Sequence, residues 1–435
     1  MSSHNPMEEV CRASRKAAQK LASMPLSRRN LVLENFKVAL VNQKAAILEA
    51  NETDIALAHE EAAKGTISDS LVKRLDLSGS KFDCLITGLD QVIAMKDPLG
   101  QRTMHSEMSP GLVMERVTTP IGVLCIIYEA RPEAAVQIAS LAVKSGNALL
   151  LKGGKEATES NRAIYMALRS ALEATPDIPE AAIQLVQTRH EIAVLLKMDK
   201  YVDMVIPRGS NSLVTYIKNN TTIPVLGHAD GICSIYVDAQ ADLDMAVKVV
   251  ADAKTDYPAA CNATETVLVH TNIAENFLPK LVSALPQVKF HADERALPFT
   301  PNGVPATEDD FCTEYLGLEI AVKTVESVEE AVDHINDHSS GHTDSILTED
   351  PAAADYFLSN IDSAGVYHNC STRFADGFRY GFGAEVGIST NRLHARGPVG
   401  MEGLTIYKYK ITGHGHTAGE FTRGEKEWTH KKLEL

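Results

Sequence analysis

One cysteine stands in a loop of small, uncharged residues, Tyr257-Pro258-Ala259-Ala260-Cys261-Asn262-Ala263-Thr264. A charged helical pattern (242–256) precedes the loop, and an apolar, β-branched strand pattern (264–270) follows it. Small neighbours leave room for a substrate to reach the sulfur, so the loop is a candidate for nucleophilic catalysis. The alternative is an inert, buried cysteine, which is what most structural cysteines are. The remainder of the chain favours the nucleophile.

Two strand-to-helix turns could bind an anion. Lys152-Gly153-Gly154-Lys155 lies between an apolar strand and a helix, where backbone amides attract anions and glycines allow close approach. It has neither the spacing of a Walker A loop nor that of G-x-G-x-x-G, so a plain turn remains the alternative. In Ile206-Pro207-Arg208-Gly209-Ser210-Asn211, Gly209 and Ser210 begin a helix, and Arg208 could meet a phosphate or carboxylate. A simple capped turn is the alternative there.

Other charged and ring side chains are weaker candidates. Arg131 follows a very apolar strand, and ligands gather at the carboxyl ends of strands in doubly wound sheets, although a surface ion pair would explain it equally well. His334, His338 and His342 recur at intervals of four, as metal ligands on one helix face could. Ser339-Ser340-Gly341 ends the helix before His342, and no acidic or thiol ligand is obviously paired with the set. We therefore assign no metal and favour capping or substrate contact.

The elements that must position these residues follow two patterns. Residues 5–94 have apolar side chains at helical spacing, which predicts helices. Strand and helix patterns then alternate, which predicts parallel sheets covered on both faces. Expected strands include Leu112–Thr118, Ile121–Tyr128, Ile223–Leu226 and, near the end, an edge strand over 404–411. We expect 291–310 to run over the surface and the tail from Gly413 to be loose.

The alternation predicts two doubly wound α/β domains with a cleft between them, the usual place for a ligand. The boundary falls near 227–231, with a return crossing near 395. We assign 1–228 to a cofactor-binding domain, 229–396 to a catalytic domain carrying Cys261, and 397–435 to a return segment, strand and tail.

Composition excludes several classes of protein. The net charge of −15 over 435 residues argues against a nucleic-acid or anionic-membrane surface. The seven cysteines are scattered without a C-x-x-C pair, which fits a reducing compartment. No apolar run approaches the ~20 residues that span a bilayer, and the N-terminus lacks the features of a signal peptide. We expect a cytoplasmic protein.

Several stretches together resemble the γ-glutamyl phosphate reductase (glutamate-5-semialdehyde dehydrogenase) family of the aldehyde dehydrogenase superfamily, from about residue 7 to Gly415. The most specific is Ala331-Val332-Asp333-His334-Ile335 followed by 338–346, His-Ser-Ser-Gly-His-Thr-Asp-Ser-Ile. Other similar stretches are 120–123, 128–132, 152–157, 206–209, 228–231 and 369–374. The resemblance implies an aldehyde dehydrogenase-like fold with a small β oligomerisation arm, to which 99–118 and 404–411 would contribute.

The resemblance also implies roles for residues. Cys261 would be the nucleophile. Lys152 would meet the adenosine ribose, Gly209 and Ser210 the pyrophosphate, and Glu314 the nicotinamide ribose. Lys155 could meet a 2′-phosphate of NADPH, with Gly153 and Gly154 beside it.

Two departures from oxidising aldehyde dehydrogenases stand out. The water-activating glutamate of their Glu-Leu-Gly-Gly run is absent, because this run is His228-Ala229-Asp230-Gly231 here. Their oxyanion-hole asparagine is replaced by Ala130, which leaves the partner of the Cys261 N–H open. Losing the base suits an enzyme that reduces its thioester and does not hydrolyse it.

The implied reaction is reduction of L-glutamate 5-phosphate by NADPH through a Cys261 thioester, giving L-glutamate 5-semialdehyde and phosphate in proline biosynthesis. Candidate substrate contacts are Arg131, Arg208, His228, Ser371 and Arg373. A homo-oligomer and a separate glutamate 5-kinase are the expected partners. The alternatives are a hydrolytic NAD(P)-dependent aldehyde dehydrogenase, and a catalytically silent nucleotide-binding protein of the same fold.

Overall fold

The apolar run that precedes Glu129 forms a completely buried strand, β3 (Val123–Tyr128). A strand without polar alternation is typical of a parallel sheet with both faces covered. In the computed structural model, which describes residues 5–435, β3 is central in a four-stranded parallel sheet of order β5-β4-β3-β6. Its neighbours are β4 (Ala148–Gly153), β5 (Ile183–Leu185) and β6 (Met204–Arg208). This sheet belongs to unit 1, which comprises the chain up to Leu226 with 382–387 and 399–435.

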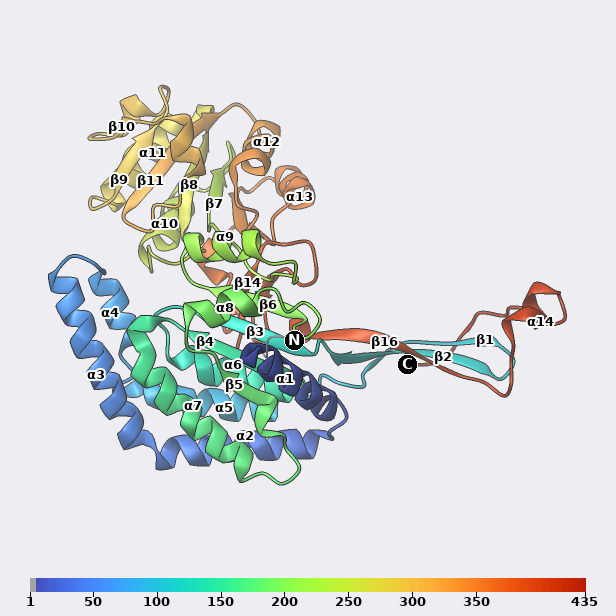
Figure 1. Cartoon of the computed structure of the whole chain (residues 1–435). Coiled ribbons are helices and arrows are strands. Elements are labelled where there is room, and N and C mark those ends of the chain that lie inside the picture. Colours follow the sequence, from blue (N-terminus) through green and yellow to red (C-terminus); the bar gives the residue numbers. More distant parts are fainter. Residues whose placement is uncertain (1–4) are drawn as a thin grey trace. The chain divides into compact units, whose positions relative to one another are not determined.

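Helices make up most of the remainder of unit 1. The predicted helical region before residue 95 is confirmed as five helices (Figure 1), and four more alternate with the strands. They are α1 (Pro6–Ala22), α2 (Leu26–Asn42), α3 (Lys44–Ala63), α4 (Asp69–Leu75), α5 (Ser80–Ala94), α6 (Glu133–Lys144), α7 (Thr158–Glu173), α8 (Arg189–Leu195) and α9 (Asn211–Asn220).

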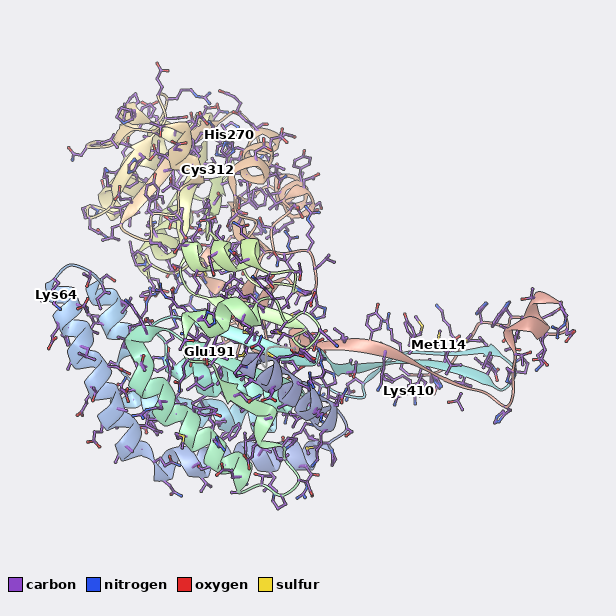
Figure 2. All side chains as sticks on the ribbon, viewed as in Figure 1. Lys64, Met114, Glu191, His270, Cys312 and Lys410 are labelled. Atoms are coloured by element: carbon purple, nitrogen blue, oxygen red, sulfur yellow. The ribbon has the colours of Figure 1, made fainter. Side chains whose placement is uncertain are left out.

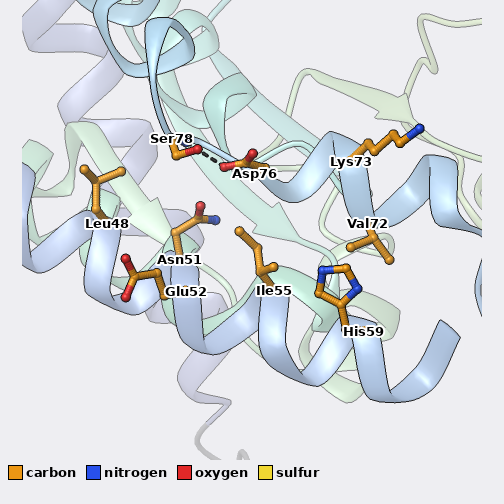
Figure 3. A pocket seen from close by; sticks show the side chains of 9 residues that line it. All are labelled: Leu48, Asn51, Glu52, Ile55, His59, Val72, Lys73, Asp76 and Ser78. Atoms are coloured by element: carbon orange, nitrogen blue, oxygen red, sulfur yellow. Dashed lines mark hydrogen bonds between the residues drawn. The ribbon is translucent and has the colours of Figure 1, made fainter. Parts of the chain in front are cut away.

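A hollow beside α3 and α4 has mixed polar and apolar walls (Figure 3). Asn51 anchors its floor, since its amide donates to the Leu75 and Ser160 oxygens and its carbonyl oxygen accepts from the Leu77 N–H. Each of these bonds ties α3 to the segment that ends α4 or to α7. The hollow is a by-product of this helix packing and contains none of the residues with a predicted role.

A separate antiparallel sheet forms an arm from distant parts of the sequence. Its order is β16-β2-β1-β17, with β1 (Arg102–Ser109), β2 (Leu112–Pro120), β16 (Thr405–Thr412) and β17 (Lys431–Lys432). β2 and β16 pair along eight residue pairs, Pro120 to Thr405 through Val113 to Thr412. Met114 and Lys410 mark this ribbon in Figure 2. The predicted edge strand is confirmed, because β16 pairs on one side only.

Unit 2 comprises 227–381 and 388–398 and is built on a seven-stranded parallel sheet. The order is β10-β9-β11-β8-β7-β12-β13. The strands are β7 (Cys233–Val237), β8 (Thr264–His270), β9 (Lys289–Ala292), β10 (Val304–Pro305), β11 (Glu319–Val325), β12 (Thr343–Leu347) and β13 (Gly365–His368). β7 and β12 are buried along their whole lengths.

Two pairs of helices cover the sheet of unit 2. One core cluster joins it to α10 (Leu243–Thr255) and α11 (Thr271–Ala284), and a second joins it to α12 (Val328–His338) and α13 (Pro351–Asn360). Alternate residues of one strand divide between the clusters: Val267 and Val269 belong to the first and Leu268 to the second. The doubly wound α/β prediction for this half of the chain is therefore confirmed.

Some expected elements differ from the structure. Ile223–Leu226 is not a strand and contributes only one bridge, Val205 to Val225, because Pro224 and the turns around it interrupt the pairing. The stretch 291–310 is not a mere surface excursion, since Val304–Pro305 adds β10 to the sheet. The tail from Gly413 is not loose. It contains α14 (Ala418–Thr422), whose capping box joins Thr417 and Glu420, and β17 pairs with β1.

Short elements complete the description: β14 (Gly387–Ser389) pairs with β15 (Gly397–Val399). Among residues 5–435, all seven cysteines are free thiols. No helix in this range has the length and apolar character needed to cross a membrane.

Candidate active site

The residues around Cys261 come from segments that each precede a strand of the unit 2 sheet. Cys261 precedes β8, His228 to Gly231 precede β7, His342 precedes β12, and Glu314 precedes β11. These strands are neighbours in the order β11-β8-β7-β12 and all run parallel. Their amino ends therefore share one edge, which brings together residues that are distant in the sequence.

Three of these side chains converge. One ring nitrogen each of His228 and His342 and the sulfur of Cys261 lie within 4.8 Å of one another. The two rings pack edge to face with their centres 5.0 Å apart. Cys261 and His228 are half-buried, whereas His342 is buried. Thiolate and imidazole are ligand types that zinc accepts, and the same groups serve a cysteine nucleophile with acid–base neighbours.

Gly231 lets the β7 segment pass directly against the nucleophile's backbone. A Cβ at position 231 would lie 2.2 Å from the Cys261 carbonyl oxygen and 2.6 Å from its Cα. Both obstacles are main-chain atoms, so no rotamer change could relieve the overlap. Cys233, two residues later, donates its S–H to the same carbonyl oxygen at 3.4 Å.

The loop of Cys261 is tied to the short helical turn η5 (Thr372–Phe374). Arg373 donates to Asp256 at 3.2 Å and also to the Asn262 side-chain oxygen. The Thr372 hydroxyl donates to the Asn262 carbonyl oxygen at 2.7 Å. Arg379 and Arg373 hold the pKa of Asp256 below its usual range. The guanidinium of Arg373, a predicted substrate contact, thus fixes the loop on both sides of Cys261.

A buried ion pair supports the segment of Glu314. Lys254 of α10 and Glu265 of β8 are completely buried and lie 2.5 Å apart. The Leu316 N–H donates to the other oxygen of Glu265 at 3.3 Å, and Leu316 has φ of 54°. Burial raises the pKa of Glu265 to about 7 against the opposing charge of Lys254, and burial lowers the pKa of Lys254.

Glu314 itself lies close to the cluster. Burial raises its pKa from the ordinary value, and the His228 ring and the Gly231 backbone offset part of that rise. The residue predicted to hold the nicotinamide ribose is therefore beside the same edge of the sheet as Cys261.

The three histidines of the sequence pattern do not form one site. His334 and His338 stack with ring centres 4.0 Å apart on α12, and burial lowers the pKa of His334 to about 3. His342 lies beyond the end of α12 and joins His228 and Cys261. The pattern of one histidine every four residues thus combines two kinds of residue. His334 is a buried, neutral histidine of the core, whereas His342 belongs to the candidate site.

The predicted cofactor residues of unit 1 lie at the carboxyl ends of their strands, whereas the Cys261 cluster of unit 2 lies at the amino ends. Residues at the carboxyl ends of β3 and β4, residues that follow β5, and the first turns of α9 surround a cavity of about 540 Å³ at the switch point of the sheet, where doubly wound folds bind nucleotides. Lys152, Gly153, Gly154 and Lys155 all line it, together with Glu129, Arg189 and the apolar side chains of Ile192, Leu213 and Tyr216.

This cavity suits the adenosine phosphate half of a dinucleotide. Lys152, Lys155 and Arg189 supply cations for phosphate oxygens, while Ile192 and Leu213 supply an apolar wall for a base. Burial lowers the pKa of Lys152, whose ammonium donates to the Gly153 carbonyl oxygen.

Gly209 and Ser210 are at the start of α9, as predicted. The Ser210 N–H donates to the Glu129 carboxylate at 2.8 Å. The carboxylate of Glu129 thus occupies the backbone amide at which the pyrophosphate of the cofactor was predicted to bind. A Cβ at position 209 would lie 2.4 Å from the same carboxylate.

The remaining predicted contacts divide between the two units. Arg208 faces Glu385 at 3.4 Å, and Arg131 precedes α6 after the left-handed Ala130 (φ 49°). Both belong to unit 1. Ser371 caps η5 by accepting from the Arg373 N–H, and His228 belongs to the Cys261 cluster. His228 lies in unit 2, although the sequence placed it in the first domain.

Two functional residues were missed from the sequence, His342 as a neighbour of Cys261 and Gly231 as its backbone support. His342 and Gly231 each lie within two residues of the start of a strand, and Cys261 also lies just before one. If those strands were known to be parallel neighbours, the three residues could have been placed at one edge of the sheet. That signal needed the strand order, which the sequence did not provide.

The sequence pattern of the aldehyde dehydrogenase family matches residues 1–302 and 297–386. γ-Glutamyl phosphate reductase 1 of Synechocystis sp. is 52% identical over 423 residues, covering 97% of this chain and 96% of that protein. The chain belongs to the γ-glutamyl phosphate reductase family of aldehyde dehydrogenases.

Other γ-glutamyl phosphate reductases agree with this assignment. The protein of Synechococcus sp. strain JA-2-3B'a(2-13) is 49% identical, covering 97% of this chain and 93% of its own length. The crystal structure of the Thermotoga maritima reductase has a TM-score of 0.91 at 42% identity, covering 95% of this chain and all of that one. The predicted aldehyde dehydrogenase-like fold is confirmed, and the family uses a nicotinamide cofactor.

Gly231→Ala tests whether the candidate active site depends on the close approach of Gly231 to the Cys261 main chain. Because the added methyl must push the Cys261 main chain aside, we expect kcat to fall by about 100-fold, the cost of a displacement near 1 Å. Nucleotide binding, measured by quenching of protein fluorescence, should stay unchanged because the cavity predicted to bind the nucleotide lies in unit 1. Gly88→Ala in α5 is the matched control, since its Cβ would meet nothing within 4 Å. A normal kcat for Gly231→Ala would contradict this reading.

Proposed function

We propose that this chain reduces L-glutamate 5-phosphate to L-glutamate 5-semialdehyde and phosphate, with Cys261 as nucleophile and NADPH as reductant, in proline biosynthesis. The observation that supports it most is the half-buried Cys261 held beside two imidazoles, in a chain about half identical to γ-glutamyl phosphate reductases. His228-Ala229-Asp230-Gly231 has no glutamate to activate water, and Gly231 brings this segment against the Cys261 backbone.

The chain's own residues account for the acyl transfer. The Cys261 thiolate attacks the acyl carbon, a C–S bond forms, and phosphate leaves with the electron pair of the broken C–O bond. His228 is suited to accept the thiol proton: its Nδ1 donates to the Ile388 carbonyl oxygen at 2.9 Å, so the neutral ring has its basic nitrogen at Nε2. Arg373, Thr372 and Asn262 keep the loop in place.

The cofactor supplies a hydride to the thioester when bound. Lys155 and Arg189 would hold its phosphates and Lys152 its adenosine ribose in the unit 1 cavity, and Glu314 would hold its nicotinamide ribose. The α9 amide now bonded to Glu129 would serve a pyrophosphate only after that carboxylate turned away.

The reaction is tested in reverse with pyrroline-5-carboxylate and NADP⁺, with and without inorganic phosphate, following NADPH absorbance. We expect NADPH to form only when phosphate is present, because phosphate and not water must cleave the thioester. Cys261→Ala should lower kcat by about 10⁴-fold or more, whereas Cys84→Ala, an exposed thiol on α5, should behave as the wild type. Formation of NADPH without phosphate would instead favour the hydrolytic aldehyde dehydrogenase.

Cofactor preference is tested at Lys155. If its ammonium meets the 2′-phosphate of NADPH, Lys155→Ala should raise the KM for NADPH about tenfold, equivalent to about 1.4 kcal/mol, and leave that for NADH unchanged. Lys218→Ala, an exposed lysine in the last turn of α9, serves as the control. An equal rise for both cofactors would place the Lys155 contact elsewhere on the dinucleotide.

We also propose that the arm joins copies of this chain. β16 is unpaired along one side, and Ile406, Tyr407, Tyr409 and Ile411 on it are 41–57% exposed. An exposed strand edge with apolar side chains on both faces favours pairing with a second copy.

The oligomer is tested by light scattering after size-exclusion chromatography. We expect a wild-type mass that is a multiple of 47.2 kDa and a shift to 47.2 kDa for Ile411→Glu, since a carboxylate resists burial. Val41→Glu on α2, similarly exposed at 52%, should leave the mass unchanged. A wild-type protein of 47.2 kDa would reject the proposal.

The setting follows from the chemistry. A kinase can make an acyl phosphate from a carboxylate and ATP, so we propose glutamate 5-kinase as the source of substrate, in the cytoplasm where free thiols persist. Pull-down of glutamate 5-kinase, or its absence, would decide whether the two proteins also associate.

A further inference from the structure

The acyl chemistry of Cys261 creates negative charge on an oxygen, and two donors normally stabilise such an oxyanion. The asparagine that provides one of them in oxidising relatives is replaced by Ala130. The backbone N–H of Cys261 has no acceptor among residues 5–435, which leaves it available as the other. The site therefore has one evident donor and needs a second.

His342 has an unused polar atom at this place. Its side chain is 1% exposed, and its Nε2 has no hydrogen-bond partner within the described chain. A buried polar atom without a partner costs about 1–3 kcal/mol, so such an atom in a well-packed site calls for an explanation. A substrate atom that is present only during the reaction would supply it.

The other nitrogen of the ring is engaged. Nδ1 lies 2.9 Å from the Thr343 hydroxyl and 3.7 Å from the sulfur of Cys233. Burial raises the pKa of Cys233 well above its ordinary value, so this sulfur carries its proton. When the Thr343 hydroxyl donates to Nδ1, the proton of the neutral imidazole resides on Nε2. Nε2–H is then a donor directed at no protein atom.

The position is suitable for a donor to the oxyanion. One ring nitrogen of His342 and the Cys261 sulfur are at most 4.8 Å apart, so an acyl oxygen on a carbon bound to that sulfur would lie next to the imidazole. His228, in the same cluster, donates through Nδ1 to Ile388, so its Nε2 accepts. The two rings thus carry opposite functions, one accepting a proton and the other donating a hydrogen bond.

We propose that the Nε2–H of His342 is the second oxyanion donor of this site, in place of the absent asparagine. The inference rests on the proposed function. When the thiolate adds to the acyl carbon, the C=O π pair moves onto oxygen, and the N–H groups of His342 and Cys261 bind that oxygen. The C=O bond re-forms as the C–O bond to phosphate breaks. After hydride from the reduced nicotinamide cofactor adds to the same carbon, the two donors hold the oxygen again. The C–S bond then breaks, and its electron pair returns to sulfur.

The test compares His342→Ala, which removes the donor, with His342→Gln, which keeps an N–H. We expect kcat for His342→Ala to fall by about 10²–10³-fold with KM changed less than about threefold, because the contact forms only as charge develops. His342→Gln should recover about tenfold of the loss. His59→Gln, an exposed histidine of α3, is the control and should match the wild type. All assays include a chelator, since a thiol and two imidazoles also bind zinc.

A second readout isolates the acylation step. Phosphate release from L-glutamate 5-phosphate in a single turnover without NADPH should slow in His342→Ala by a factor similar to that in kcat. Alkylation of Cys261 by iodoacetamide, which forms no oxyanion, should proceed at the wild-type rate in a folded variant. If His342→Ala does not fold, the same measurements on His342→Gln and His342→Asn decide.

The outcomes separate the inference from the proposed function. A wild-type enzyme without phosphate-dependent turnover would reject the proposed function. An active wild type, with a His342→Ala variant whose kcat is unchanged and whose KM is raised, would make His342 a ground-state contact and overturn the inference. Slowed alkylation in the folded variants would also overturn it, by assigning His342 to the activation of sulfur.

Discussion

The site of unit 2 depends on the parallel pairing of β11, β8, β7 and β12. Because these strands point the same way, the segments that enter them meet at one edge, and each brings one or two of the residues grouped around Cys261. The pairing is held by strands buried on both faces, with α10 and α11 on one side and α12 and α13 on the other. In unit 1 the candidate site is at the opposite edge of the sheet, formed by the carboxyl ends of the strands. Helices begin there, around the cavity that Lys152 and Lys155 line.

The loop of Cys261 is fixed mostly by contacts to its main chain. The charged side chains that support it and the neighbouring Glu314 segment are bonded to other groups and not to the sulfur. Gly231 meets its backbone, Cys233 and Thr372 bond to its carbonyl oxygens, and Arg373 joins the residues on either side. The charged pair Lys254 and Glu265 lies below, where burial keeps it from water and where Glu265 orders the Leu316 amide. Full charges thus shape the surroundings, while the side chains that converge at the site itself are one cysteine and two histidines.

The sequence was sufficient to predict most helices and strands and to identify candidate site residues, but not which of these residues come into contact in the fold. The apolar run before Glu129 and the alternation after it were sufficient for a doubly wound fold. Small neighbours made Cys261 a candidate, and the remainder of the chain was needed to favour it over an inert cysteine. The spacing of four grouped His342 with His334, whereas the strand order placed it with Cys261. Arg373 was a candidate substrate contact because its charge suits an anionic substrate, and only the fold shows that Asp256 and Asn262 lie beside it. Ile223–Leu226 had the composition of a strand, but Pro224 and the turns around it limit its pairing with β6 to one bridge.

The placement of β12 between β7 and β13 has a consequence for the order of assembly during synthesis. The ribosome delivers the Cys261 loop and β7 well before β12, whose pairing with β7 brings His342 to the edge. Until that strand inserts, the sulfur is present without one of its neighbouring imidazoles. A chain stalled before residue 343 would therefore have the Cys261 loop without His342, and the contacts of Thr372 and Arg373 with that loop form later still.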